Sequence, residues 1–215
     1  MSHFVKTNDY FTIDLNVNEK YFLVSSKWQY NWNNAANTSK WTSEEKAQFH
    51  NQSDKLIWKA WSNKFRLKCK GTSDFADKHK SDTFLVNFDI KKVTSAGNWK
   101  VDVNKIPTGQ TGPSYVIWAL KKISLDSEDV VIRKRTENGK IYGQIPVSHE
   151  FGHTVGNSVY WNLHGDEYKA ESTFVLDKDS IMNIGNQLRK RHLDHLLNVL
   201  NDASSPLIPN TEFYV

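Results

Sequence analysis

Two histidines four residues apart enclose a glutamate in the segment His149-Glu150-Phe151-Gly152-His153. If this segment is a helix, residues four apart lie on the same face, so both imidazole rings can reach one zinc ion. The glutamate lies to the side of that pair, where its carboxylate can accept a proton from an activated water molecule. The spacing therefore predicts that His149 and His153 are metal ligands and that Glu150 is a catalytic base.

The third ligand must come from outside this segment, because two histidines do not complete a zinc site. A catalytic centre has three protein ligands and an open fourth position, whereas a structural centre has four protein ligands. The nearest candidates downstream lie in His164-Gly165-Asp166-Glu167-Tyr168. Because imidazole nitrogens and carboxylate oxygens both bind zinc, the chemistry leaves His164, Asp166 and Glu167 open as the third ligand.

The segment His149–Gly156 resembles the zinc-binding helix of the metzincin peptidases, whose pattern is H-E-x-x-H-x-x-G-x-x-H or D. A bacterial branch of that family is similar in reading H-E-F-G-H-x-x-G-x-x-D-E-Y, and this chain contains Asp166-Glu167-Tyr168. The resemblance implies a zinc peptidase in which Asp166 is the third ligand, with His164 ranked second and Glu167 third.

The spacing of the third ligand departs from the metzincin pattern. In that family the glycine turns the chain sharply, so that the third ligand returns to the metal three residues later. In this chain Val159 stands three residues after Gly156, and Asp166 follows seven residues later still. The resemblance therefore implies an insertion of seven residues that loops out between Asn157 and Gly165.

The segment Asp179–Asn183 is similar to the Met-turn of the same family, a tight turn that places a methionine beneath the zinc ligands. It contains Met182, and the only other methionine of the chain is the first residue. Methionine is an adaptable apolar side chain, and a dry floor under a metal strengthens its electrostatics. Some metzincins carry a tyrosine two residues later that assists the reaction, but this chain has Ile184 there. The side chains considered as substitutes are Tyr168, His192 and His195.

His192 and His195 both fall in the last predicted helix. One interpretation is a pair of histidines in solvent or at the edge of the core. The other is that His192 donates a hydrogen bond to the negatively charged oxygen that develops during peptide hydrolysis. The sequence leaves both interpretations open.

Hydrophobic periodicity predicts a sheet with three helices. A capping box formed by Thr42 and Glu45 begins the first helix, whose apolar residues recur at helical spacing from Phe49 to Phe65. Pro146 lies in the first turn of the motif helix, where its missing N–H is harmless, and a last helix is expected around Leu188–Leu200. The predicted strands are residues 10–17, residues 20–32, Phe65–Lys70, Thr83–Val93, Trp99–Ile106, Tyr115–Ile123, and the two arms Val130–Arg135 and Lys140–Gly143 of a hairpin that turns at Asn138-Gly139.

This order of elements predicts an α+β (mixed α/β) fold. The resemblance to the metzincins implies a twisted sheet with a backing helix, an active-site helix and a C-terminal helix. It also implies a single catalytic domain over residues 1–215, with an N-terminal lobe of about residues 1–156 and a C-terminal lobe of about residues 157–215.

The composition and the N-terminal sequence limit the cellular locations and the partners that we expect. Cys69 is the only cysteine of the 215 residues, so no intrachain disulfide can form. The net charge is +4, with basic residues spread along the chain, so we expect no nucleic-acid partner. No apolar stretch approaches ~18 residues, so no membrane span is expected. Because the N-terminus does not read as a signal peptide, we expect either a cytoplasmic protein or export by a non-classical, specialised route.

Taken together, these patterns predict a zinc-dependent endopeptidase that uses Zn²⁺ and Glu150 to cleave a protein or peptide substrate, with cell-wall peptides as one substrate class. We expect an extended substrate to pair with an edge strand, such as one arm of the Val130–Gly143 hairpin. A monomer is favoured. The alternative is a non-catalytic structural-zinc or binding module, in which His164 closes the coordination sphere, within a secreted toxin or effector.

Overall fold

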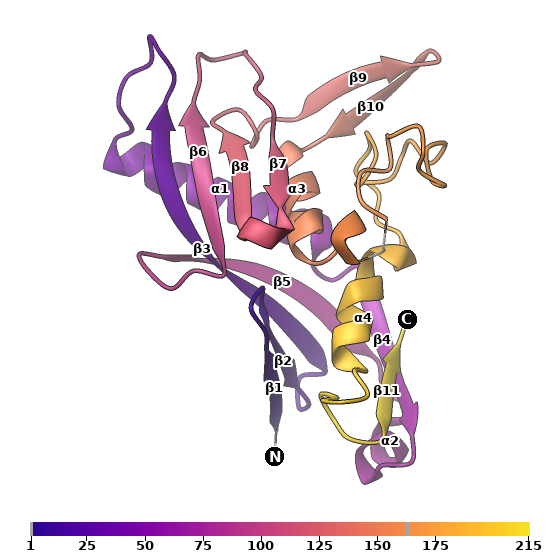
Figure 1. The fold of residues 1–215 in the computed structure, drawn as a ribbon. Coiled ribbons are helices and arrows are strands. Elements are labelled where there is room, and N and C mark those ends of the chain that lie inside the picture. The colour runs from indigo at the N-terminus through magenta and orange to yellow at the C-terminus, as the bar shows by residue number, and fades with distance from the viewer. Residues whose placement is uncertain (1, 162–163) are drawn as a thin grey trace.

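The computed structural model describes residues 2–161 and 164–215. Within these residues, nine strands form one twisted sheet, in which β5, β3, β6 and β8 run parallel to one another (Figure 1). The order along the sheet is β11-β4-β5-β3-β6-β8-β7. In addition, β2 pairs with β3, and β1 pairs with β2. The strands are β1 (His3–Thr7), β2 (Thr12–Asn16), β3 (Tyr21–Asn34), β4 (Phe65–Gly71), β5 (Phe84–Val93), β6 (Trp99–Lys105), β7 (Tyr115–Ile117), β8 (Lys122–Asp126) and β11 (Thr211–Tyr214).

The α+β fold predicted from the sequence is confirmed. Helix α1 (Ser43–Trp61) crosses behind the sheet, and its predicted capping box is present (Figure 1). The Glu45 amide donates to Thr42 Oγ1 over 3.2 Å, and the Thr42 amide donates to Glu45 Oε2 over 2.8 Å. The buried face of α1 ends at Trp61, whose indole N–H donates to the backbone oxygen of Ser148. This contact joins the backing helix to the motif helix.

The motif helix α3 (Pro146–Thr154) is buried along its whole length. Pro146 is its first residue, as predicted, and the Val147 amide donates to the backbone oxygen of Asp129. On one side α3 packs against β7 at the end of the sheet, where the Trp118 indole donates to the backbone oxygen of His153 over 2.7 Å. The helix that carries the candidate ligands is therefore anchored to both the backing helix and the sheet.

The chain after α3 builds the opposite side of the site. It passes through the 3₁₀ turn η2 (Val159–Trp161), a series of turns, the 3₁₀ turn η3 (Lys190–Leu193) and α4 (Asp194–Leu200). Strand β11 then pairs with β4, so the C-terminal strand joins the sheet of the N-terminal half. A single hydrophobic core contains buried apolar residues from across the chain, the first of them Phe11 and the last Phe213.

The predicted strand Tyr115–Ile123 is wrong. The chain forms β7, then the 3₁₀ turn η1 (Trp118–Leu120), and reverses at Lys121, whose φ is 48°. Strand β8 then returns antiparallel to β7. The continuous apolar pattern concealed this reversal, because Trp118 is buried against α3 rather than in the face of a strand.

Other boundaries also differ from the prediction. The Asn138-Gly139 hairpin is confirmed, but its arms are β9 (Arg133–Glu137) and β10 (Lys140–Gln144), because residues 127–132 turn around buried Asp129. The last helix begins later, as η3 followed by α4. The sequence patterns did not predict β1, β11 or α2 (Asp74–His79).

None of the helices in the described residues is long and apolar enough to cross a membrane.

Candidate metal centre

Three predicted ligands converge in the structure. His149 Nε2 lies 3.2 Å from Asp166 Oδ1, and His153 Nε2 lies 3.1 Å from the same oxygen. The three ligand atoms lie within 4.8 Å of one another, and this trio is the one such group found among the described residues. The chain between Gly156 and Asp166 therefore leaves α3 and returns to it, although part of the expected insertion, residues 162–163, lies outside the described residues.

Both imidazole rings are held by backbone carbonyl groups. His149 Nδ1–H donates to the backbone oxygen of Ile181 over 2.8 Å, and His153 Nδ1–H donates to that of Asn157 over 2.6 Å. Such bonds keep a proton on Nδ1 and direct the other nitrogen, Nε2, towards Asp166, where it can bind a metal. Ile181 belongs to the predicted Met-turn segment and Asn157 follows α3, so each ring is oriented by a different part of the C-terminal half.

The donor set fits zinc. Four ligands at about 2.1 Å in a tetrahedron lie about 3.4 Å apart, close to the separations of the two Nε2 atoms from Asp166 Oδ1. Two imidazole nitrogens and one carboxylate oxygen are ligands that zinc accepts in sites with an open position. Calcium and magnesium, in contrast, prefer shells of oxygen ligands.

Glu150 lies beside this trio as a buried carboxyl group. The described residues supply no hydrogen-bond partner to its Oε2 atom. Burial raises the pKa of the carboxyl group to about 7, and the negative charge of Asp166 adds to that rise. A carboxyl group with a pKa near 7 can both accept and return a proton at neutral pH, which is the property that a general base and acid needs.

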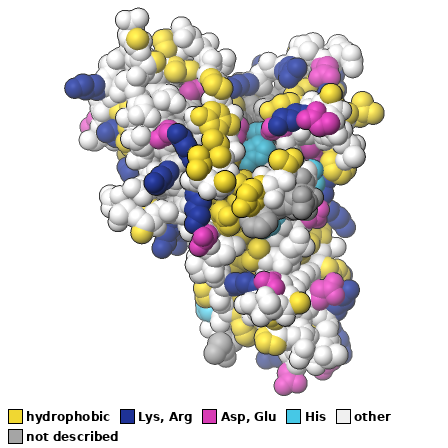
Figure 2. Space-filling model, viewed as in Figure 1, with side chains coloured by type: hydrophobic (Ala, Val, Ile, Leu, Met, Phe, Trp, Pro, Cys, Tyr) yellow, Lys and Arg dark blue, Asp and Glu magenta, His cyan; other side chains and the backbone are white. Residues whose placement is uncertain are grey.

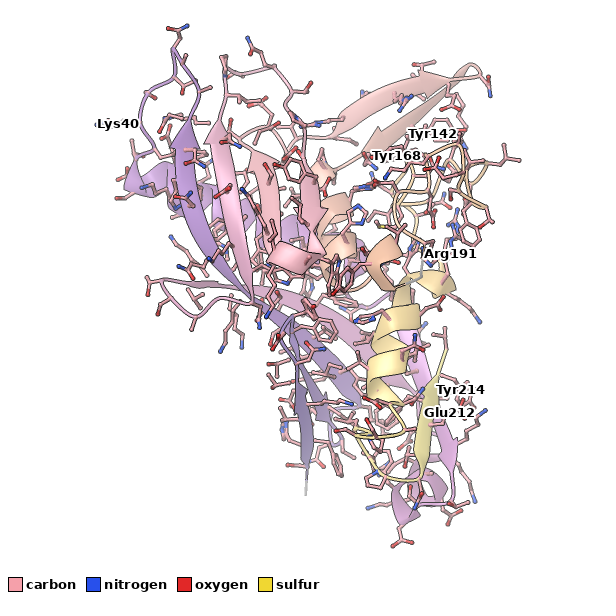
Figure 3. The ribbon with its side chains drawn as sticks, viewed as in Figure 1. Lys40, Tyr142, Tyr168, Arg191, Glu212 and Tyr214 are labelled. Carbon is pink, nitrogen blue, oxygen red and sulfur yellow. The ribbon has the colours of Figure 1, made fainter. Side chains whose placement is uncertain are left out.

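Asp166 is held as a carboxylate. Burial opposes its ionisation, but the contacts with His149 and His153 keep its pKa far below its usual range. The second carboxylate oxygen lies 3.1 Å from Lys169 Nζ. Tyr168 lies near α3 (Figure 3), and its ring is stacked on that of His149 with the ring centroids 6.1 Å apart. Burial, followed by the charge of Asp166, raises the pKa of the Tyr168 hydroxyl group.

Met182 lies directly under the motif helix, as the predicted Met-turn requires. Its side chain is fully buried. A Cβ atom added at Gly152 would collide with Met182 Sδ and lie 2.8 Å from Trp61 Cζ2. The turn itself is closed by the Met182 amide, which donates to Ser180 Oγ over 3.2 Å. The glycine between the two histidines therefore lets the methionine approach the backbone of the helix.

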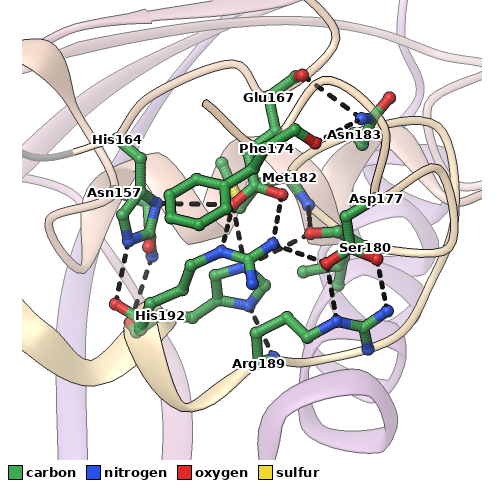
Figure 4. Close-up of polar contacts among 12 residues, drawn as sticks. Asn157, His164, Glu167, Phe174, Asp177, Ser180, Met182, Asn183, Arg189 and His192 are labelled. Carbon is green, nitrogen blue, oxygen red and sulfur yellow. Dashed lines mark hydrogen bonds and ion pairs between the residues drawn. The ribbon is translucent and has the colours of Figure 1, made fainter. Parts of the chain in front are cut away.

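Glu167, the third-ranked candidate ligand, is directed away from the metal centre. Its carboxylate is fully buried and receives two hydrogen bonds from Arg191, at 2.7 and 2.8 Å (Figure 4). The Glu167 amide donates to the backbone oxygen of Met182, and the Glu167 backbone oxygen accepts a hydrogen bond from Asn183 Nδ2. Burial opposes ionisation, yet Arg191 and His192 lower the pKa of Glu167 to about 2.

The other three histidines considered from the sequence, His164, His192 and His195, lie in the same interior region. His164 Nε2 donates to the backbone oxygen of Arg191 over 3.0 Å, so this second-ranked candidate does not join the trio. His192 accepts the Arg189 amide at Nδ1, while its Nε2 lies 3.3 Å from Ser180 Oγ. These contacts favour a core position over the role of oxyanion donor. His195 packs against Gly156 and the ring of Phe11, and burial lowers its pKa to about 4.

The supporting groups were missed by sequence reasoning. Four groups support the motif helix, its histidines and Glu167 by hydrogen bonds: the side chain of Arg191, the carbonyl groups of Ile181 and Asn157, and the indole of Trp118. The two residues joined by each of these bonds are 4 to 35 positions apart in the sequence. A single sequence contains no signal for such contacts. Comparisons with models of protein families, with curated proteins and with solved structures found no match.

Proposed function

We propose that the protein is a zinc-dependent peptidase. The observation that supports this most strongly is the convergence of His149 Nε2, His153 Nε2 and Asp166 Oδ1 beside the buried carboxyl group of Glu150. The resemblance of the motif helix and of the Met-turn segment to the metzincins agrees with this geometry. Together they support a catalytic rather than an incidental histidine pair.

A zinc ion held by the trio would act as a Lewis acid, which promotes the ionisation of water and polarises a carbonyl group. In the proposed reaction Glu150 accepts a proton from the attacking water molecule. The water oxygen bonds to the carbonyl carbon of the substrate, and the electron pair of the C=O bond moves to the carbonyl oxygen. Glu150 then delivers the proton to the amide nitrogen as the C–N bond breaks.

A structural zinc site is the competing function, and ligand number distinguishes the two. A structural site needs a fourth protein ligand, for which His164 was the candidate. In the described residues His164 instead contacts Arg191, and the group of possible ligands contains three members. This arrangement supports an open fourth position and hence catalysis.

We propose that the substrate pairs with β7 as an extended strand. Strand β7 ends the order of the sheet and packs against α3. Its outer edge can offer backbone hydrogen-bonding groups to a peptide next to the metal centre. The hairpin of β9 and β10, one arm of which was the example of an edge strand given from the sequence, forms a separate two-stranded sheet that projects from the molecule (Figure 1). The hairpin arm therefore becomes the second choice.

The direct experiment removes and restores the metal. Chelated protein should not cleave denatured protein substrates, and one equivalent of zinc should restore cleavage. Cleavage that persists without metal would contradict the proposal. A cytoplasmic location or export by a non-classical route, and the monomeric state, stay predictions. Fractionation of producing cells tests the first, and sedimentation tests the second.

A further inference from the structure

Exposed apolar side chains are concentrated in the segments that precede and follow α3. Among the described residues, thirteen large apolar side chains are exposed, and ten of them fall between Tyr115 and Leu176. These residues belong to β7 and the turn after it, to the hairpin of β9 and β10 with the turn before it, and to the turns that follow α3. In the space-filling view, hydrophobic side chains border the hollow in which histidine side chains are visible (Figure 2). Concentrations of exposed apolar surface mark binding sites more often than scattered single residues do.

One side of this border is β7 and the turn that follows it. Tyr115, Ile117 and Leu120 are 42%, 37% and 64% exposed. Their position relative to the metal centre is fixed, because Trp118 donates to the backbone oxygen of the ligand His153. A peptide paired with the outer edge of β7 would therefore place its side chains beside these three.

The other side comes from the chain after α3. Val159 and Tyr160 are 74% and 54% exposed, and Tyr160 stacks on Trp118 with ring centroids 6.4 Å apart. Tyr168 is 44% exposed and covers the ring of His149. We call the six residues together the apolar rim: Tyr115, Ile117, Leu120, Val159, Tyr160 and Tyr168.

We infer that the apolar rim selects extended protein segments with large apolar or aromatic side chains on both sides of the cleaved bond. Small or charged side chains bury less apolar area than Leu or Phe and would leave more of these residues in water. An extended segment also satisfies the outer edge of β7, which a lipid surface cannot. The inference rests on the proposed peptidase function and names the substrate class of that site.

The test measures binding separately from turnover. Zinc-loaded Glu150→Gln protein is titrated by calorimetry with three peptides of equal length. The first has Leu and Phe on either side of the central bond, the second has Ser at both positions, and the third is a cell-wall stem peptide. We expect the first peptide to bind about 10-fold or more tightly than the other two.

Substitutions in the rim should remove this preference. Ile117→Ser and Leu120→Ser change exposed side chains, so each variant should fold, and each should bring the first two peptides closer in affinity. The control is Leu176→Ser, which removes an 89% exposed leucine outside the rim and should leave the preference intact.

Three results would overturn the inference: equal affinity for the first two peptides, tighter binding of the stem peptide, or an unchanged preference in both rim variants. A dimer in sedimentation that dissociates in Ile117→Ser would also overturn it, because the rim would then serve self-association. If wild type binds the apolar peptide selectively but never cleaves it, the proposed function fails while the selectivity stands.

Discussion

Glu167 and Arg191 form a bidentate ion pair, and Glu167 is the residue that follows the candidate ligand Asp166. The carboxylate is fully buried, and Arg191 also donates to Asp177 over 2.7 Å. The Glu167 amide also donates a hydrogen bond to the backbone oxygen of Met182. The ion pair and this hydrogen bond together hold the segment that contains Asp166 against the turn beneath the metal centre. The geometry explains why Asp166 and Glu167, adjacent in sequence, have different roles.

Replacing Arg191 by Met should destabilise the protein by about 3–5 kcal/mol, because Glu167 would remain as a buried charge without its partner. Chemical denaturation of the metal-free protein measures this loss. Zinc affinity should fall by about 10- to 100-fold as Asp166 loses its support. The control is Lys70→Met, which breaks an exposed pair with Glu212 and should cost less than about 1 kcal/mol. Equal losses in the two variants would contradict the account.

Asp166→Ala should weaken zinc binding by more than about 100-fold, since removal of a ligand should exceed the effect of losing an outer-shell partner. His164→Ala should bind zinc with nearly the affinity of wild type. Competition titration against a chromophoric chelator gives both values. The ligand assignment is wrong if the larger loss occurs in His164→Ala.

Asp129 should make a pH-dependent contribution to stability. It is fully buried beside Asp126 and Arg133, and burial raises its pKa from 3.8 to about 6. Because the folded state holds this proton more tightly, the contribution is complete below pH 3.8 and disappears as the pH rises through 6. The shift corresponds to about 3 kcal/mol. The difference in unfolding free energy between wild type and Asp129→Asn should therefore change between pH 4 and 6, and a constant difference would refute this prediction.

Gly152→Ala should destabilise the protein by about 1–3 kcal/mol, because the added methyl group collides with Met182 and approaches Trp61. The higher helix propensity of Ala works in the opposite direction by about 1 kcal/mol. In a Met182→Ala background the same substitution should cost less, since the sulfur atom is gone. Thermal or chemical unfolding of the four proteins measures this coupling, and additive effects would show that the two residues are not in contact.

Local patterns predicted the parts of the fold that depend on neighbouring residues. The Thr42 capping box, the Asn138-Gly139 turn and Pro146 as the first residue of α3 were all predicted, because each depends on residues within a few positions. Strand β11 was missed, since four residues near the C-terminus acquire strand structure only by pairing with β4.

In the candidate site, too, the features that depend on neighbouring residues were predicted and those that depend on distant residues were not. The spacing of His149, Glu150 and His153 is a property of one helix and could be predicted from the sequence. Asp166 was nominated by a resemblance, although the spacing differs by seven residues. The burial that raises the pKa of Glu150, and the pairing of Glu167 with Arg191, arise from residues distant in sequence and emerge only in the folded chain.

The central claim, that this is a zinc peptidase in which Glu150 moves the proton, is tested most directly by Glu150→Gln. The variant and wild type should each bind one zinc ion, measured by metal analysis after dialysis. Hydrolysis of denatured protein by the variant should fall by at least about 100-fold, the lower bound expected for loss of a general base. A variant that binds zinc and retains the activity of wild type would contradict the account.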